Sequence, residues 1–255
     1  MQIGGDLAQW STDGLNRYHA GIMAGFADQN SKTKNNLNGY YSKGKTTGYS
    51  AGLYGTWYAD DADKSGLYTD AWVLYNWFDH EVHSEQFSAE KYTSRGVTAS
   101  VESGYTFKAG EFITASDTVN TFFLQPKAQI TFQGVKAKNH KNADGADVRS
   151  SGDNNIRTRL GLRAYLHGHN VIDDGKGRNF EPFAEINWIY NSQKYGVRIN
   201  DDQFDIAGTR NIGEIKAGVE GQINTNLNLW GNVAQQIGDA GYSDTQAMLG
   251  VKYLF

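Results

Sequence analysis

In the last nine residues of the chain, AMLGVKYLF, apolar side chains recur at every second position. One set of alternate positions is entirely apolar: Ala247, Leu249, Val251, Tyr253 and Phe255. A period of two is that of a β-strand, because successive side chains of a strand point to opposite faces. The sequence therefore predicts that the chain ends on a strand with one apolar face.

The same alternation recurs along the chain and predicts an all-β protein. The predicted strands cover residues 3–10, 17–29, 45–59, 67–82, 92–107, 121–138, 155–168, 179–193, 211–223, 227–238 and 245–255. Most exceed the five or six residues usual in globular sheets. They are long enough to cross a bilayer, where a tilted strand needs about 9–11 residues.

Two antiparallel architectures fit this pattern, a soluble β-sandwich and a transmembrane β-barrel, and the connections discriminate between them. One alternate set of connections is short: 11–16, 60–66, 108–120, 169–178 and 224–226. The other set is longer and more polar: 30–44, 83–91, 139–154, 194–210 and 239–244. Short turns at one end and longer loops at the other are typical of outer-membrane barrels. The connections favour the barrel, with the sandwich as the alternative.

The polar faces of the strands carry charges of both signs. In the barrel these side chains point into the lumen, and opposite charges on neighbouring strands attract. The predicted lumen-lining charge network consists of Asp70, Glu102, Lys127, Arg157, Arg159, Arg163, Glu181, Glu185, Glu214, Lys216 and Glu220. In a sandwich, the same residues would form a solvated outer face.

Glycines and aromatic residues add detail to the barrel interpretation. Six glycines share the lumenal parity and are predicted to make room for bulky neighbours such as Tyr54: Gly21, Gly25, Gly48, Gly52, Gly104 and Gly161.

Aromatic side chains near strand ends resemble the girdles at membrane interfaces: Tyr18, Trp57, Tyr75, Trp77, Trp188, Tyr190 and Phe255.

The composition excludes several classes of protein and site. The 255 residues include no Cys, which excludes disulfides and thiolate metal sites. The formal net charge of −4 gives no basic footprint for nucleic acid. No stretch approaches the roughly 20 apolar residues of a transmembrane helix. We expect a single domain, residues 1–255.

Several segments then carry a family resemblance: QIGGDLAQW (2–10), HAGIMAGFADQN (19–30), DAWVLYNWF (70–78), FLQPKAQITFQGV (123–135), FEPFAEINWIYN (180–191), GEIKAGVEGQINTNLNLWGNV (213–233) and YSDTQAMLGVKYLF (242–255). In this ordered series the chain resembles the C-terminal translocator domain of type V autotransporters, in particular the diffuse-adherence adhesin type. The resemblance implies a 12-stranded antiparallel barrel in the bacterial outer membrane that exports and anchors an N-terminal passenger.

The resemblance also implies partners and a role for the last strand. The expected partners are outer-membrane lipid, the β-barrel assembly machinery, the passenger and its linker helix, with no cofactor and no nucleic acid. The family's last strand is the signal for the assembly machinery, and that role maps onto Leu249, Val251, Tyr253 and Phe255. The C-terminus would then lie in the periplasm.

The sequence departs from the family in strand number, because eleven strands are predicted and bacterial single-chain barrels have even numbers. We therefore expect a fragment that lacks the family's first strand and lumenal helix. Such a fragment would either hold a gap or pair 3–10 directly with 245–255. An additional strand within 30–44 or 108–120 would contradict this expectation.

Catalysis is the remaining question, and we expect neither an enzyme nor a metal site. Asp79 and His80 are adjacent on a strand and point to opposite faces. His167 and His169 share a face, but no third metal ligand is evident. Passenger self-cleavage by lumenal acids, the alternative considered, would recruit Asp70, Glu102 or Glu214. A general porin is the second function class and a barrel enzyme the third; a histidine within hydrogen-bond reach of a serine or carboxylate would favour the enzyme.

Overall fold

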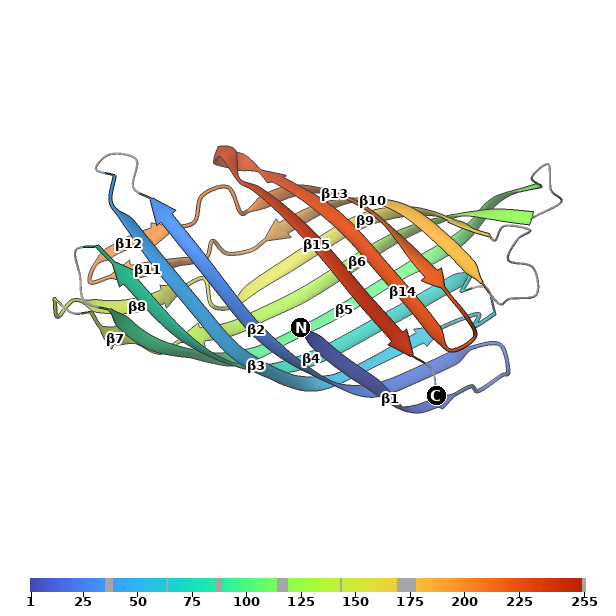
Figure 1. The fold of residues 1–255 in the computed structure, drawn as a ribbon, viewed down its shortest axis with the longest axis horizontal. Coiled ribbons are helices and arrows are strands. Elements are labelled where there is room, and N and C mark those ends of the chain that lie inside the picture. Colours follow the sequence, from blue (N-terminus) through green and yellow to red (C-terminus); the bar gives the residue numbers. More distant parts are fainter. Residues whose placement is uncertain are drawn as a thin grey trace.

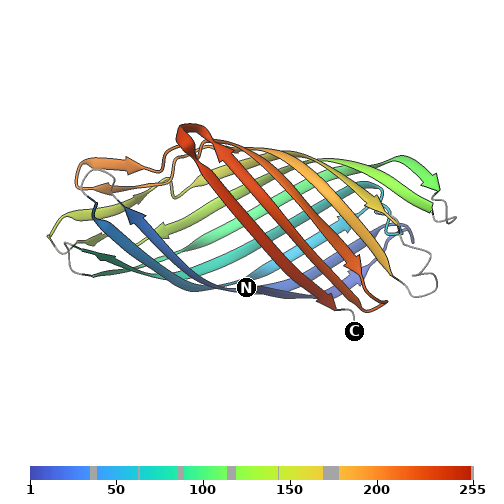
Figure 2. The same ribbon diagram turned by 45° about the horizontal axis from the view of Figure 1, so that its top comes forward.

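A curled antiparallel sheet forms the body of the protein. The computed structural model describes residues 1–34, 39–62, 64–85, 89–113, 119–142, 144–168 and 178–253. In this part of the chain the long strands pair in the order β1-β2-β3-β4-β5-β6-β9-β10-β13-β14-β15 (Figures 1 and 2). Their bounds are β1 (Gln2–Trp10), β2 (Arg17–Lys34), β3 (Tyr41–Tyr58), β4 (Gly66–Ser84), β5 (Glu90–Ile113), β6 (Val119–Ala137), β9 (Asn155–His167), β10 (Asn179–Asn191), β13 (Asn211–Gln222), β14 (Leu227–Gly238) and β15 (Ser243–Tyr253).

The all-β prediction is confirmed, and each of the eleven predicted strands has a counterpart. The differences lie at the ends: β5 runs to Ile113 and β2 to Lys34, beyond the predicted limits. The described parts of 30–44 and 108–120 hold only the ends of these strands and of their neighbours. The one helical element among the described residues is a single 3₁₀ turn, Asp239–Gly241. None of the helical structure in the described residues is long and apolar enough to span a membrane.

The apolar faces of the strands point outward from the curled sheet and are exposed. Leu162, Ile186, Val219 and Val251 are all exposed. In a sandwich these side chains would fill a dry centre between two sheets. Exposed apolar side chains on several neighbouring strands are instead typical of a surface that contacts lipid or a partner. The sandwich alternative is therefore wrong.

Two aromatic rows border this apolar surface. Tyr18 and Trp57 lie with ring centroids 6.2 Å apart near one end of β2, and Phe26 and Tyr49 lie 5.4 Å apart further along. In the ladder Tyr49 is opposite Trp77. From Tyr18 to Phe26 the strand rises about 27 Å, or about 20 Å normal to a membrane at a strand tilt of about 40°. This spacing suits an apolar band with an aromatic girdle at each border.

The sheet has two free edges. Within the described part of the chain, β1 pairs only with β2, β15 pairs only with β14, and no pairing joins β1 to β15. Eleven alternating strands make β1 and β15 run in the same direction, as Figure 1 shows. A cavity of about 1340 Å³ is lined by residues of both edges, from Gln2 on β1 to Tyr253 on β15. Of the two expectations for a fragment, the structure has the gap.

A second, smaller sheet extends one end of the barrel. It comprises β7 (His140–Lys141), β8 (Asp147–Ser151), β11 (Gly196–Ile199) and β12 (Asp202–Asp205), in the order β12-β11-β8-β7. These strands arise from the two longest predicted loops, and they lie at the left end in Figure 1. We call this the long-loop end. The opposite end, which carries the turns 11–16 and 223–226, is the short-turn end.

Candidate functional site

An ion-pair chain crosses the inner face of the sheet. Lys127 Nζ on β6 lies 3.1 Å from Glu185 Oε1 on β10 and 3.8 Å from Glu102 Oε1 on β5. Lys216 Nζ on β13 lies 3.7 Å from the same oxygen of Glu185. Tyr68 on β4 donates a 2.9 Å hydrogen bond to Glu102. Glu185 is therefore held between two ammonium groups from strands on either side.

Glu214 continues the chain on β13. Its Oε1 lies 3.4 Å from Arg159 Nη2 and 3.8 Å from Lys216 Nζ. Asn187 Nδ2 donates to Glu185 at 2.8 Å and to Glu214 at 2.9 Å, which joins the two carboxylates through one amide. The side chains of Glu185 and Glu214 are only 3% and 1% exposed. Buried carboxylates need such partners, because an uncompensated buried charge is costly.

Strand register places these groups together. Glu185 is opposite Lys216 and Asn187 is opposite Glu214 in the β10–β13 ladder. All of them have the inward parity, so side chains two residues apart on one strand meet groups from two neighbours. We call Glu102, Lys127, Arg159, Glu185, Asn187, Glu214 and Lys216 the central charge network.

Other residues expected in a lumenal network form separate contacts. Arg163 is opposite Glu185 in the ladder, but its Nη2 pairs with Glu220 at 2.7 Å and its guanidinium lies 4.1 Å from the Phe183 ring centroid. Glu181 Oε1 lies 2.5 Å from His167 Nδ1.

Asp70 and Arg157 lie on the inner face without an ion pair among the described residues. Asp70 accepts a 2.6 Å hydrogen bond from the Thr56 hydroxyl. Arg157 is half-buried on β9, two residues from Arg159 and opposite Asn191 on β10. The structure thus joins most, but not all, of the eleven expected residues in ion pairs.

Gly161 makes the central charge network possible. A Cβ on Gly161 would lie 2.1 Å from Asn187 Oδ1, the end of the amide that joins Glu185 and Glu214. The absence of a side chain at Gly161 therefore leaves the space that this amide occupies. Gly21 and Gly104 similarly face the rings of Tyr54 and Tyr68, at 2.5 and 2.6 Å from a built Cβ.

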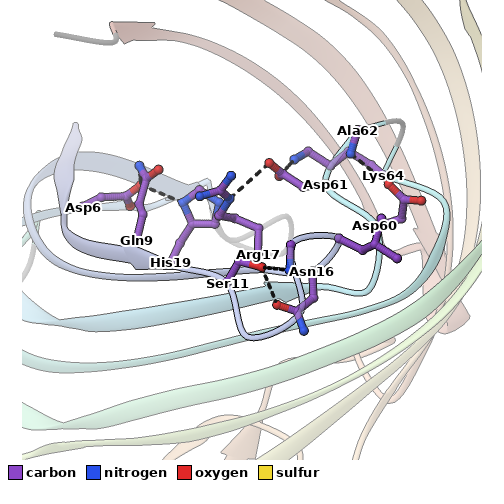
Figure 3. A network of polar contacts seen from close by, with 12 residues as sticks. Asp6, Gln9, Ser11, Asn16, Arg17, His19, Asp60, Asp61, Ala62 and Lys64 are labelled. Carbon is purple, nitrogen blue, oxygen red and sulfur yellow. Dashed lines mark hydrogen bonds and ion pairs between the residues drawn. The ribbon is translucent and has the colours of Figure 1, made fainter.

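A second inward cluster, which was not predicted, lies near the short-turn end. Asp6 lies 2.8 Å from His19 Nδ1 and accepts a 2.7 Å hydrogen bond from Gln9 (Figure 3). The Tyr54 hydroxyl also donates to Asp6. Asp6 and Gln9 are three residues apart, so a regular strand would point them to opposite faces. A bulge between Asp6 and Ala8 corrects the parity. The only sequence signal would have been the inward parity of His19 and Tyr54.

His80 lies within hydrogen-bond reach of a serine, which is the geometry that would favour an enzyme. His80 Nε2 lies 2.7 Å from Ser94 Oγ, and His80 Nδ1 lies 2.9 Å from Thr46 Oγ1. The group that orients the imidazole is therefore a hydroxyl, where a hydrolase triad has a carboxylate. In the described residues no three potential ligands gather to hold a metal ion. His169 lies outside the described residues.

The terminal strand β15 is exposed on its apolar face. Leu249 and Val251 are 89% and 68% exposed, and Tyr253 is exposed as well. Among the described residues β15 pairs with β14 alone, so it forms one edge of the sheet. Phe255 lies outside the described residues.

Comparison with known proteins identifies the family of this barrel. The family model described as "Autotransporter beta-domain" matches residues 1–234. The uncharacterized protein YdeU of Escherichia coli K12 is 55% identical over 99% of this chain and 54% of its own length. The autotransporter adhesin AIDA-I of Escherichia coli is 37% identical over the whole of this chain and 20% of its own length. The chain thus spans between about a fifth and a half of the length of these curated relatives.

Solved structures agree. The transport unit of AIDA-I from Escherichia coli matches with a TM-score of 0.90 and 36% identity, over 100% of this chain and 81% of that one. The β domain of the Bordetella autotransporter BrkA matches in fold, with a TM-score of 0.67 at 21% identity, over 100% of this chain and 89% of that one. The porin alternative finds no support among these relatives. The chain belongs to the autotransporter β-domain family, a class of outer-membrane translocator.

Proposed function

We propose that this β-domain exports an N-terminal passenger through the bacterial outer membrane and anchors it at the cell surface. The observation that carries the proposal is the division of the sheet into an outward apolar band between aromatic rows and an inward charged face. A lipid-facing belt around a polar interior is what a membrane-spanning conduit needs. The AIDA-I relative is named an autotransporter adhesin, and the passenger of this protein would be of that kind.

The two free edges supply a place for the passenger's linking segment. Because β1 and β15 run in the same direction, one further strand antiparallel to both would close the barrel with an even strand number. We propose that the segment joining passenger and barrel provides a lumenal helix, followed in the chain by this strand. Arg157 and Asp70, which have no ion pair among the described residues, would contact that helix.

Orientation and assembly follow from the same geometry. We propose that the short-turn end and the C-terminus face the periplasm, and that the long-loop end faces outward. The β-barrel assembly machinery would bind the edge of β15 by strand addition. Leu249, Val251 and Tyr253 are exposed on this strand. Phe255 would belong to the same signal.

We propose no catalytic step for the barrel itself. The His80–Ser94 hydrogen bond has a hydroxyl rather than a carboxylate behind the imidazole, and Ser94 is buried. A structural role for this bond between β4 and β5 accounts for the contacts. If passenger release stopped in a Ser94→Ala variant whose barrel still assembled, this part of the proposal would be wrong.

Surface display tests the function. The chain is expressed with the sequence that its gene encodes before Met1, an epitope replaces the natural passenger, and protease is added to intact cells. We expect the epitope to be removed by the protease, and to stay inside cells when Val251→Asp and Tyr253→Asp are combined. An epitope that never reaches the surface while the barrel is folded in the outer membrane would contradict export.

A further inference from the structure

The two strands that border the gap, β1 and β15, are held in place by different contacts. Each pairs with one neighbouring strand among the described residues, and almost all residues of both strands are exposed. Backbone pairing and burial therefore do not distinguish the two edges. The difference lies in side-chain and turn contacts that reach past the first neighbour to the second.

The first contact of this kind lies on the inner face of β1. The Tyr54 hydroxyl on β3 donates to Asp6 on β1, so this side chain crosses the intervening strand β2. It crosses at Gly21, where a Cβ would lie 2.5 Å from the Tyr54 ring. Asp6 also lies 2.8 Å from His19 Nδ1 on β2 (Figure 3). One carboxylate thus joins β1 to both of the strands that follow it.

The second contact is made by the turn after β1. This turn is held together by the buried Asn16, whose Oδ1 accepts from the Thr12 amide at 2.9 Å and whose Nδ2 donates to the Thr12 hydroxyl at 2.7 Å. The turn between β3 and β4 docks on it, because the Asp61 amide donates to the Leu15 carbonyl at 2.9 Å. Asp61 Oδ2 also lies 3.2 Å from Arg17 Nε at the start of β2 (Figure 3).

The third contact lies on the outer face. Trp10, the last residue of β1, stacks on Tyr18 of β2 with ring centroids 5.1 Å apart and planes 5° apart. The Tyr18 ring centroid lies 6.2 Å from that of Trp57 on β3. Such ring pairs add to the stability gained from their buried area. We call these three sets of contacts, on the inner face, at the turn and on the outer face, the β1 brace.

Strand β15 has no equivalent of the β1 brace among the described residues. Gln235 on β14 donates to the Ser243 hydroxyl at 3.0 Å and accepts from the Thr245 hydroxyl at 2.5 Å. From Ser243 to Lys252, no side-chain hydrogen bond or ion pair of the described residues reaches beyond β14. At the long-loop end a single 3₁₀ turn joins β15 to β14. The two sides of the gap are therefore unequal.

We infer that the β1 brace makes β1 the fixed side of the gap and leaves β15 as the side that moves when the barrel closes; this rests on the proposed closing strand. An edge that is already ordered binds a new strand with less loss of conformational entropy than a mobile edge. The closing strand adds to β1 first, and β15 pairs with it last. Until then the edge of β15 is accessible for strand addition by another protein.

Amide hydrogen exchange of the folded protein tests this inference. The chain is produced with the sequence that its gene encodes before Met1 and folded in detergent, and exchange is followed by mass spectrometry. We expect the amides that pair β15 with β14 to exchange about tenfold faster than those that pair β1 with β2. We expect Tyr54→Phe combined with Asp61→Asn to speed exchange in β1 by about tenfold, with β15 unchanged.

Refolding from urea provides a second readout. Because the double variant no longer holds the β1 edge in place, we expect its closed barrel to form about threefold more slowly than that of the unmodified protein. Heat-induced gel mobility follows the closed form and shows that each variant is folded. Each single variant should show a smaller increase of exchange in β1, which keeps the test available if the double variant does not fold.

Glu111→Gln is the matched control. It removes an exposed ion pair with Lys108 in the β5–β6 hairpin, so exchange in β1 should stay within about twofold of the unmodified protein. Equal exchange in β1 and β15 of the unmodified protein would overturn the inference. Unchanged exchange in β1 of the double variant would overturn the role given to the β1 brace.

Exchange in the sequence before Met1 separates this inference from the proposed function. If that sequence is protected while β1 and β15 exchange equally, the inference alone is wrong. If that sequence is unprotected while β15 still exchanges faster than β1, the proposed closing strand alone is wrong.

Discussion

The central charge network and the small sheet at the long-loop end are both polar, but they are built in opposite ways. The network is set by the register of long strands, and its carboxylates are buried among cations from neighbouring strands. The small sheet is set by backbone pairing between two loops, with Val197 opposite Ser150 and Phe204. We expect the barrel to depend on the first region for its stability and to fold without the second.

The largest expected effect comes from Glu185→Gln. The change leaves Lys127 and Lys216 without the carboxylate that lies between them. Because breaking a buried ion pair leaves an uncompensated charge, we expect a loss of about 3–5 kcal/mol in the free energy of unfolding. Denaturant unfolding of the barrel in detergent measures it. As a control, Glu111→Gln removes an exposed pair with Lys108 and should cost no more than about 1 kcal/mol. Equal effects would remove the distinction between buried network and exposed charge.

Gly161→Ala tests the central charge network by filling the space that the Asn187 amide occupies. The added methyl would meet Asn187 Oδ1 and displace the amide that joins Glu185 to Glu214. We expect a loss of about 2–3 kcal/mol by the same measurement. Gly213→Ala is the matched control, because the nearest atom to its Cβ is 3.9 Å away. A tolerated Gly161→Ala would show that the amide has room to move.

Gly152→Val tests the small sheet at the long-loop end. Gly152 has φ +76°, and a Cβ there would lie 2.3 Å from the carbonyl oxygen of Lys194, beside β11. We expect the loops that form the small sheet to become sensitive to protease, with an unchanged midpoint of barrel unfolding. If the midpoint fell as far as in Glu185→Gln, the small sheet would be part of the stabilising core.

The smallest effect is expected at the short-turn end, in Asp13→Ala. Backbone amides of Asn16 and Leu15 donate to Asp13 and hold the pKa of its carboxyl below the usual range. A lowered pKa in the folded state contributes stability above the unfolded pKa of about 3.9, and this contribution is lost as the pH falls through the folded value. The variant should therefore be slightly less stable than the unmodified protein at pH 7. The difference should shrink as the pH falls below about 3.9 and vanish once the carboxyl is protonated in the folded state. A difference that persisted in acid would point to another cause.

The strands and the inward parity of the network were predictable from the sequence because both depend on local alternation. A period of two and antiparallel neighbours are enough to predict that Glu185, Lys216 and Glu214 share the inner face. The β10–β13 ladder places them together. The role of the Asn187 amide was not predictable, since it depends on side-chain rotamers. The bulge at Asp6 and Ala8 was equally hidden, because one extra residue leaves no mark in a pattern of small and polar side chains.

The small sheet could not be predicted from the sequence, for a different reason. Strands β8 and β11 are short, and each lies in a polar segment with little alternation. They become strands only because the barrel brings two loops, about 50 residues apart in the chain, to the same end. Non-local pairing of this kind follows from the fold and does not reveal itself in a local pattern.

The orientation of adjacent side chains tests the central claim most directly, and the chain has no cysteine to interfere. Ser50 points inward beside Gly25, and its neighbour Ala51 is exposed on the outer band. In vesicles, we predict that Ser50→Cys reacts with a water-soluble maleimide, and that a fluorophore at Ala51→Cys is quenched by lipid-borne quenchers. The reverse result, with Ala51→Cys facing water and Ser50→Cys facing lipid, would contradict a barrel with an apolar exterior and a charged interior.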